Sequence, residues 1–127
     1  HFVRPTAFRD VPNDMRIARE EIFGPVAVII PFKDEEDVVR MANDNDYGLA
    51  SYLWTQDVGK VHRIANRIEA GMMFVNSQNV RDLRTPFGGV KGSGTGREGG
   101  DYSFEVFCEP KNVCISMGSH HIPKWGV

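Results

Sequence analysis

The chain has 127 residues, of which 41% are hydrophobic and 25% are charged, and its formal net charge is −2. This is the length of one ordinary domain, and the hydrophobic content excludes a chain that is disordered by composition. The slightly acidic balance argues against nucleic acid or an anionic membrane surface as a partner, and no apolar run approaches the length of a membrane span.

The start of the chain and its cysteines indicate its setting. Residues 1–3 contain no initiator methionine, and the charged residues that follow interrupt any signal-peptide pattern, so we expect a piece of a longer protein. Cys108 and Cys114, the two cysteines, do not form the pattern of a disulfide-rich secreted domain. A reducing, cytoplasmic setting fits this usage.

The first part of the chain predicts a strand, a short helix and a second strand. Residues 2–11 are extended, and Pro5 favours an edge position. A helix over residues 14–21 follows, and Gly24-Pro25 stops it. Residues 26–30 are uniformly apolar, as in a strand covered on both faces. The helix residues expected to face inward are Met15, Ile17, Ala18 and Ile22.

The middle of the chain continues the alternation. Asp34 is placed to cap a helix that breaks at residues 43–48, and a strand is expected over residues 49–54. Asp57 is the next N-cap, and its helix runs at helical spacing of apolar residues to Gly71. A short buried strand over residues 72–75 ends at Asn76. This alternation predicts an α/β fold class.

The last part of the chain differs in character. Residues 76–100 are rich in glycine, and a loop this long in a compact domain is typically functional. A short helix is expected within residues 98–107, then a lone strand over 111–117 and a surface tail over 118–127. Because the lone strand has no neighbour in sequence, a partner subunit is expected to cover it. Cys114 is expected to point inward on that strand as a small hydrophobe.

Two local patterns suggest chemistry that the context does not support. Residues 94–99 match G-x-G-x-x-G, but no strand precedes them and no βαβ unit follows, so we expect no pyrophosphate site there. The cysteine spacing does not suit zinc, and no local base or cationic group would activate a thiol. We therefore expect neither a metal site nor a nucleophile among the residues Cys108, Cys114, His120 and His121.

Residues 19–26 (REEIFGPV) place two carboxylates and an aromatic ring beside a Gly-Pro bend. A carboxylate can accept hydrogen bonds from a sugar diol, and a ring can cover a flat heterocycle, so this run suggests half of a dinucleotide site. The alternative is that Glu20 and Glu21 are solvated charges and that Phe23 belongs to the core. A carboxylate at a helix C-terminus is unfavourable with the helix dipole, which asks for a compensating reason.

Arg81 and Arg84 flank Asp82 in the glycine-rich region. They are either surface arginines, one of them paired with Asp82, or a clamp for an anionic substrate. The second interpretation rests on the match between a guanidinium fork and a carboxylate.

A series of motifs occurs in a fixed order along the chain. Its segments are residues 20–26 (EEIFGPV), Asn43, 47–50 (YGLA), Asn76, 86–89 (PFGG) and 93–98 (SGTGRE). This series resembles the C-terminal part of the aldehyde dehydrogenases, and the resemblance covers Phe2 to about Met117. It implies residues 1–110 as the end of the catalytic domain and residues 111–127 as an oligomerisation strand and tail, in a homo-oligomer.

The resemblance also implies roles for single residues. Glu21 matches the carboxylate that holds the nicotinamide ribose of NAD, and Phe23 matches the ring beside the nicotinamide. Asn76 and Phe87 match positions that shape the active-site wall. The family's nucleophilic cysteine precedes the EEIFGP run, so no catalytic residue is expected in this chain.

Residues 80–89 (VRDLRTPFGG) and 123–126 (PKWG) resemble the muconic semialdehyde dehydrogenases of aromatic degradation. This implies oxidation of a semialdehyde with two or three negative charges to its carboxylic acid, with Arg81 ahead of Arg84 as the clamp. Hydroxymuconic and aminomuconic semialdehydes are alternative substrates. The alternative to an enzyme is a non-enzymatic module for self-association. The resemblance implies that this chain alone is inactive.

Overall fold

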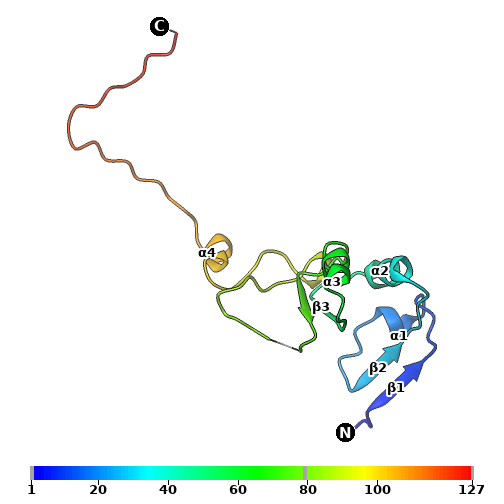
Figure 1. The fold of residues 1–127 in the computed structure, drawn as a ribbon. Coiled ribbons are helices and arrows are strands. Elements are labelled where there is room, and N and C mark those ends of the chain that lie inside the picture. The colour runs from blue at the N-terminus through cyan, green and yellow to red at the C-terminus, as the bar shows by residue number, and fades with distance from the viewer. Residues whose placement is uncertain (1, 79, 127) are drawn as a thin grey trace.

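Two separate pairs of parallel strands organise the chain in the computed structural model, which describes residues 2–78 and 80–126 (Figure 1). β1 (Thr6–Arg9) pairs with β2 (Val26–Ile29), and β3 (Ala50–Leu53) pairs with β4 (Met72–Val75). Parallel strands need a crossover connection, and a helix lies in each one. The alternation confirms the α/β fold class. Asn79 and the two chain ends, where expectations were also placed, lie outside the described residues.

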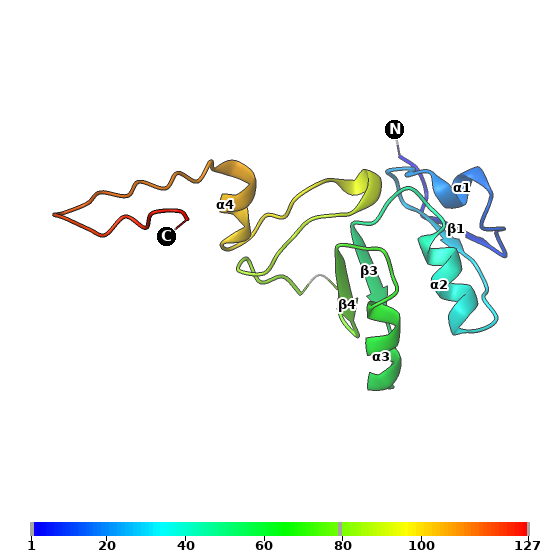
Figure 2. The ribbon, with the colours of Figure 1, turned by 90° about the horizontal axis from the view of Figure 1, so that it is seen from above.

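The helices connect and cover these strands. Their bounds are α1 (Arg16–Arg19), α2 (Glu35–Asn43), α3 (Val58–Ala65), α4 (Tyr102–Phe107) and a short 3₁₀ helix (Lys91–Ser93). In both ribbon views α2 lies between the first strand pair and α3 (Figures 1 and 2). None of the helices in the described part of the chain combines the length and the apolar character needed to cross a bilayer.

Both predicted helix caps are confirmed. The Asp34 carboxylate accepts a hydrogen bond of 2.9 Å from the Asp37 backbone N–H, and the Asp57 carboxylate accepts one of 3.0 Å from the Lys60 N–H. Each bond satisfies a backbone donor that the first helical turn leaves free. The acids that the sequence marked therefore begin α2 and α3.

Two helices are shorter than predicted. α1 spans four residues, and Met15 and Ile22, expected inward, are about half exposed. α3 ends at Ala65, well before Gly71, because the chain turns at Asn66. The Asn66 N–H still donates a hydrogen bond to the His62 carbonyl, so the helical hydrogen-bonding pattern continues for one residue past α3.

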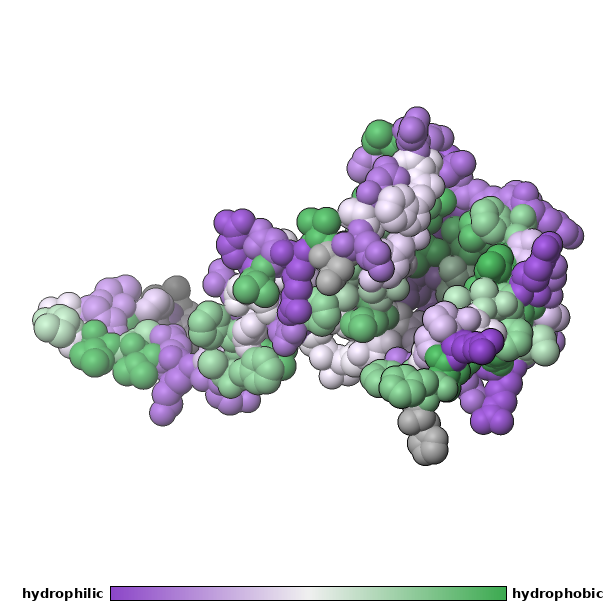
Figure 3. All heavy atoms as spheres, turned by 90° about the horizontal axis from the view of Figure 1, so that it is seen from below, coloured by the Kyte–Doolittle hydropathy of each residue, from purple (hydrophilic) through white to green (hydrophobic). Residues whose placement is uncertain are grey.

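The hydrophobic interior is small for a chain of this length. Among the described residues, the buried hydrophobic ones are Val11, Val39 and Ile64, which keep 5% to 7% of their surface exposed. The accessible surface is 10947 Å², whereas a folded monomer of this mass exposes about 6,800 Å². Hydrophobic atoms therefore lie across the outer face (Figure 3). The prediction that β2 is covered on both faces is wrong for this chain, because Ala27 and Ile29 are exposed.

The prediction of a strand over residues 111–117 is also wrong for this structure. The segment has no regular secondary structure and extends away from the rest of the molecule (Figure 1). Val113, Ile115 and Met117 are 68%, 76% and 96% exposed. Cys114, expected to be buried, is exposed too. A strand needs a hydrogen-bonding neighbour, and none lies beside this segment.

Ion pairs join α2 to α3 and to the turn that follows α3. Arg63 donates two hydrogen bonds of 3.0 Å to the Glu35 carboxylate, and Arg67 donates to both oxygens of Glu36, one at 2.6 Å. These bonds to Arg63 and Arg67 lower the pKa of Glu35 and of Glu36 from the ordinary value of 4.5. Both ion pairs lie on the exposed side of α2 and fix its position relative to the segment that contains α3.

Stability should therefore depend on pH through Glu35 and Glu36. Because the native pKa values are lowered, the ion pairs contribute fully above pH 4.5 and are lost as the pH falls through the native pKa values. We expect the urea midpoint of the wild type to exceed that of a Glu35→Gln/Glu36→Gln variant at pH 7, and the difference to shrink below about pH 4.5. A difference that stays constant with pH contradicts this role.

Candidate functional site

The first candidate group is the carboxylate segment, residues 20–24, between α1 and β2. The chain leaves the helical conformation at Glu20, whose backbone is extended. The Glu20 carboxylate accepts a hydrogen bond of 2.7 Å from Arg16 Nε. Within the described residues, the Glu21 carboxylate makes no hydrogen bond or ion pair. The two adjacent glutamates therefore differ, and Glu21 is the one free to accept from a ligand.

Phe23 stands beside that carboxylate with an unusual backbone. Its φ is +53°, a conformation that non-glycine residues adopt at a cost, and its side chain is 94% exposed. Glu21 and Phe23 line the same shallow hollow of about 370 Å³, together with the end of α1 and the start of β2. An acceptor for hydroxyl groups and an uncovered aromatic face thus lie together, as the sequence predicted.

Asn76 connects the ends of the second strand pair. Its side-chain oxygen accepts a hydrogen bond of 2.8 Å from the Thr55 N–H, and its side-chain nitrogen donates one of 2.7 Å to the Thr55 carbonyl. Its φ of +49° turns the chain out of β4. Asn76 therefore fixes the start of the long loop, and its role in a substrate wall stays a prediction.

The second candidate group lies in the arginine loop, residues 80–98, which folds back on itself. The Phe87 N–H donates to the Glu98 carbonyl at 2.7 Å, and the Glu98 N–H donates to the Phe87 carbonyl at 2.8 Å. Arg97 Nη1 donates to the Gly89 carbonyl at 2.7 Å. These bonds hold the turn over residues 86–89 and present the Phe87 ring.

The two arginines of the loop have different surroundings. The Arg81 guanidinium lies 4.3 Å from the centre of the Phe87 ring, a cation–π arrangement, and donates to Glu98 at 3.2 Å. The Arg84 side chain is 88% exposed, and its guanidinium donates three hydrogen bonds to Asp82, the shortest of 2.6 Å. The Asp82 pairing raises the pKa of Arg84, and that of Asp82 is lowered. Arg84 is engaged locally, whereas Arg81 has a single weak carboxylate contact.

Arg81 and Phe87 line a hollow of about 390 Å³ beside β4. The hydrophobic part of the wall comes from Met72, Phe74 and Val75, and the wall also contains Asp82, whose charge is paired with Arg84. A positive group within an apolar wall suits a carboxylate carried by a carbon skeleton.

Two further sequence patterns, residues 94–99 and the two cysteines, lie in surroundings that do not suit the sites they suggested. No helix begins within residues 94–99, and α4 starts only at Tyr102, so the G-x-G-x-x-G match lacks the strand–turn–helix context. Cys108 and Cys114 are both free and exposed. Across the described ranges, no group of three or more histidine, cysteine, aspartate and glutamate side chains is placed to hold a metal ion.

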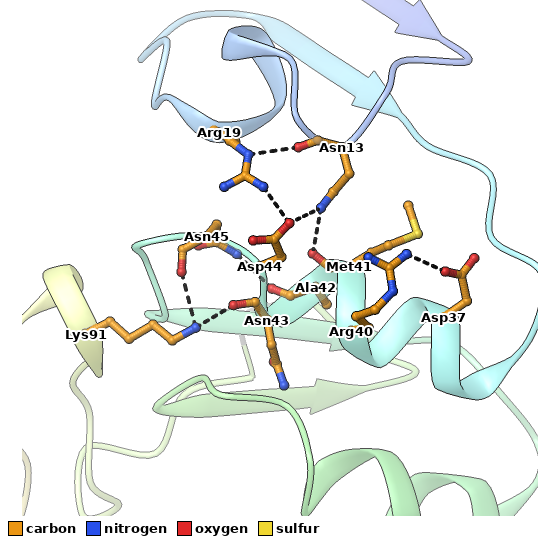
Figure 4. Close-up of polar contacts among 10 residues, drawn as sticks. All are labelled: Asn13, Arg19, Asp37, Arg40, Met41, Ala42, Asn43, Asp44, Asn45 and Lys91. Carbon is orange, nitrogen blue, oxygen red and sulfur yellow. Dashed lines mark hydrogen bonds and ion pairs between the residues drawn. The ribbon is translucent and has the colours of Figure 1, made fainter.

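Sequence reasoning missed three polar residues that hold the candidate groups in place: Lys91 and Asp44, which link the groups to α2, and Glu98, which contacts Arg81 within the arginine loop. Lys91 donates to the carbonyls of Asn43 and Asn45, Asp44 receives Arg19, and Glu98 receives Arg81 (Figure 4 shows the first two sets). The only available signal was a lysine inside a glycine-rich loop. The pairs are 17 to 48 residues apart in sequence, so local patterns cannot reveal them.

Comparisons with known proteins agree with the motif series. Residues 1–113 match the profile of the aldehyde dehydrogenase family. The 5-carboxymethyl-2-hydroxymuconate semialdehyde dehydrogenase of Escherichia coli is 67% identical over 103 residues, 81% of this chain and 22% of that protein. The 2-hydroxymuconic semialdehyde dehydrogenase of Pseudomonas putida is 49% identical over 116 residues, 91% of this chain and 24% of that protein.

The fold agrees as well. A crystal structure of a Mycobacterium tuberculosis aldehyde dehydrogenase complexed with NAD⁺ matches 94% of this chain and 25% of that one, with a TM-score of 0.85 and 48% identity. The chain thus spans about a quarter of the length of these relatives. With a family match over most of its residues and a matching fold, this chain belongs to the aldehyde dehydrogenase family.

Proposed function

We propose that this chain forms the C-terminal part of an NAD-dependent dehydrogenase that oxidises 5-carboxymethyl-2-hydroxymuconate semialdehyde to the carboxylic acid. The identity of 67% to the Escherichia coli enzyme of that name supports the substrate. The observation that carries the proposal is Arg81, which holds a guanidinium over Phe87 in a partly hydrophobic hollow while Arg84 is bound to Asp82. 2-Hydroxymuconic and 2-aminomuconic semialdehydes are the alternative substrates.

The carboxylate segment suits the nicotinamide end of NAD, which accepts a hydride when bound. Glu21 is free of hydrogen-bonding partners within the described residues and would accept from the two ribose hydroxyls. Phe23 is held outward at a positive φ and would lie beside the nicotinamide ring. The solved relative complexed with NAD⁺ supports this choice of cofactor.

The three candidate substrate residues then have defined roles. Arg81 would bind a carboxylate of the substrate, and Phe87 and Asn76 would shape the wall beside it. The covalent chemistry would belong to residues outside these 127, because the nucleophilic cysteine that the family resemblance implies precedes the EEIFGP run, whereas Cys108 and Cys114 follow it. We place the enzyme in the cytoplasm, where free thiols are stable.

Self-association is the second candidate function. The segment over residues 111–126 exposes Val113, Ile115, Met117 and Trp125, and Trp125 is fully exposed. In the proposed enzyme this oligomerisation segment would pair with another copy of the chain. If the chain is instead a non-enzymatic module, the intact protein would form oligomers through this segment and would have no dehydrogenase activity.

The test compares the 127-residue polypeptide with the full-length protein that carries it. NADH formation is followed at 340 nm with the three muconic semialdehydes and a neutral aldehyde. We expect no turnover by the polypeptide alone and NAD-dependent oxidation of the semialdehydes by the full-length protein. Turnover by the polypeptide overturns the assignment of the chemistry. An oligomeric full-length protein without turnover favours the self-association module.

A further inference from the structure

The two candidate groups lie on parts of the molecule that share no sheet. The carboxylate segment borders β2, and the arginine loop borders β4, and the two strand pairs are separate. No backbone–backbone hydrogen bond between described residues joins the range 5–33 to the range 48–107. Both groups are instead anchored to residues 34–47. The arginine loop is joined to this stretch by the backbone bond of 2.8 Å from the Gly92 N–H to the Asp46 carbonyl and by side chains, and the carboxylate segment is joined to it by side chains.

Those side chains converge on the end of α2, which we call the α2 terminal turn, residues 41–45 (Figure 4). From the side of the carboxylate segment, Arg19 pairs with the Asp44 carboxylate, and Asn13 donates to the same carboxylate at 3.2 Å and to the Met41 carbonyl at 3.4 Å. Arg19 also donates to the Asn13 carbonyl at 3.1 Å. Arg19 is only two residues from Glu21.

From the other side, the arginine loop reaches the same turn through Lys91. Its ammonium group donates to the Asn43 carbonyl at 2.7 Å and to the Asn45 carbonyl at 3.2 Å, and it pairs with Glu69. Lys91 itself has a φ of +53°, so the loop adopts a costly backbone conformation at this point. The Asn43 side chain continues the network to the Arg67 carbonyl and the Glu69 N–H.

Simple capping does not explain this arrangement. A helix C-terminus attracts cations, because its last carbonyls are free and it is the negative end of the helix dipole. The cationic groups usually come from residues nearby in sequence. Here the donors come from residues 13, 19 and 91, on both sides of the helix in sequence. α1 has no buried residue of its own, so packing alone does not fix the start of the carboxylate segment.

We propose that the α2 terminal turn sets the position of the carboxylate segment relative to the arginine loop, with Asp44 and Lys91 as its positioning residues. Asp44 holds the segment that carries Glu21 and Phe23. Lys91 holds the loop that carries Arg81 and Phe87. This inference rests on the proposed function for the cofactor and substrate roles of the two groups.

The proposal predicts opposite kinetic signatures for two variants of one turn, measured in the full-length enzyme. Asp44→Ala should raise the KM for NAD about tenfold and leave that for the semialdehyde within about twofold. Lys91→Met should raise the KM for the semialdehyde about tenfold and leave that for NAD within about twofold. Arg40→Ala is the matched control, because it removes an ion pair with Asp37 on the same helix that reaches neither group. Arg40→Ala should leave both constants within about twofold.

A double variant tests whether Arg19 and Asp44 act together. Arg19→Ala/Asp44→Ala should raise the KM for NAD by less than the combined effects of the two single variants, because both single variants lose the Arg19–Asp44 contact. Additive losses overturn the pairing. Equal changes in both KM values for Asp44→Ala indicate a purely structural role and overturn the proposal.

Hydrogen exchange separates this inference from the proposed function. Asp44→Ala should speed amide exchange over residues 16–24 about tenfold, with β3 and β4 unchanged. Unchanged exchange over residues 16–24 overturns the positioning role, whatever the enzyme oxidises. If the wild type reduces no NAD with any aldehyde, the proposed function fails, and the exchange result still decides whether Asp44 positions the segment.

Discussion

Replacing Arg81 with alanine in the full-length enzyme should raise the KM for the anionic semialdehyde about 10- to 100-fold, while the KM for a neutral aldehyde changes less than about twofold. The expected range corresponds to the loss of charge-assisted hydrogen bonds to one carboxylate. The reason lies in the placement of Arg81, which is stacked on Phe87 and faces the apolar wall beside β4. Equal losses on both substrates contradict a clamp.

Three further variants sharpen this result. Arg81→Lys keeps the charge without the planar fork and should fall between the wild type and Arg81→Ala. Glu98→Gln removes the carboxylate that Arg81 contacts at 3.2 Å, so the KM for the anionic substrate should fall by a few-fold. Arg84→Ala is the matched control, because Arg84 is already bound to Asp82. A loss for Arg84→Ala that equals the loss for Arg81→Ala would reverse the order of the two arginines.

Gly71→Ala should lower the stability of the full-length enzyme by about 3 kcal/mol, seen as a fall in melting temperature of more than about 5 °C. A Cβ atom at Gly71 would lie 1.7 Å from the Gly88 carbonyl oxygen and 2.8 Å from the carbonyl carbon. Both contacts are to backbone, so no side chain can rotate away. The start of β4 or the turn that carries Phe87 must move.

The same substitution at Gly24 supplies the control. A Cβ there meets only Ile22 Cγ2 at 3.9 Å, an ordinary contact. Gly24→Ala should therefore keep the melting temperature within about 2 °C of the wild type. A Gly71→Ala enzyme as stable as Gly24→Ala would show that β4 and the Phe87 turn do not lie as close as the structure places them. A raised KM for the semialdehyde in any surviving Gly71→Ala enzyme is expected as well.

Local chemistry explains which parts of the fold were predictable. Asp34 and Asp57 begin helices because a carboxylate at that position satisfies free backbone donors, a rule that needs no tertiary information. Residues 72–75 form a strand as predicted, between two turns. In contrast, the predicted strand over residues 111–117 did not form, because a strand depends on a neighbour that these residues do not supply.

The features of the two candidate groups also divide into those that local sequence predicts and those that it does not. Glu21 and Phe23 are two residues apart, so the Gly-Pro bend next to them was enough to predict that they lie together. The order of motifs was enough to identify the family, which the comparisons confirm. Arg81 and Arg84 were not separable by sequence beyond a resemblance, because each could pair with Asp82. The structure shows that Arg84 does so.

The sequence by itself determined the α/β alternation, the helix caps and the family, since these depend on neighbouring residues or on the order of motifs along the chain. Tertiary structure alone decided that Arg81 pairs with Glu98, and that Asp44 and Lys91 meet at the α2 terminal turn. The physical reason is range. Backbone capping acts over three or four residues, whereas the bonds that bring Arg19 and Lys91 to the α2 terminal turn join residues 25 to 48 positions apart.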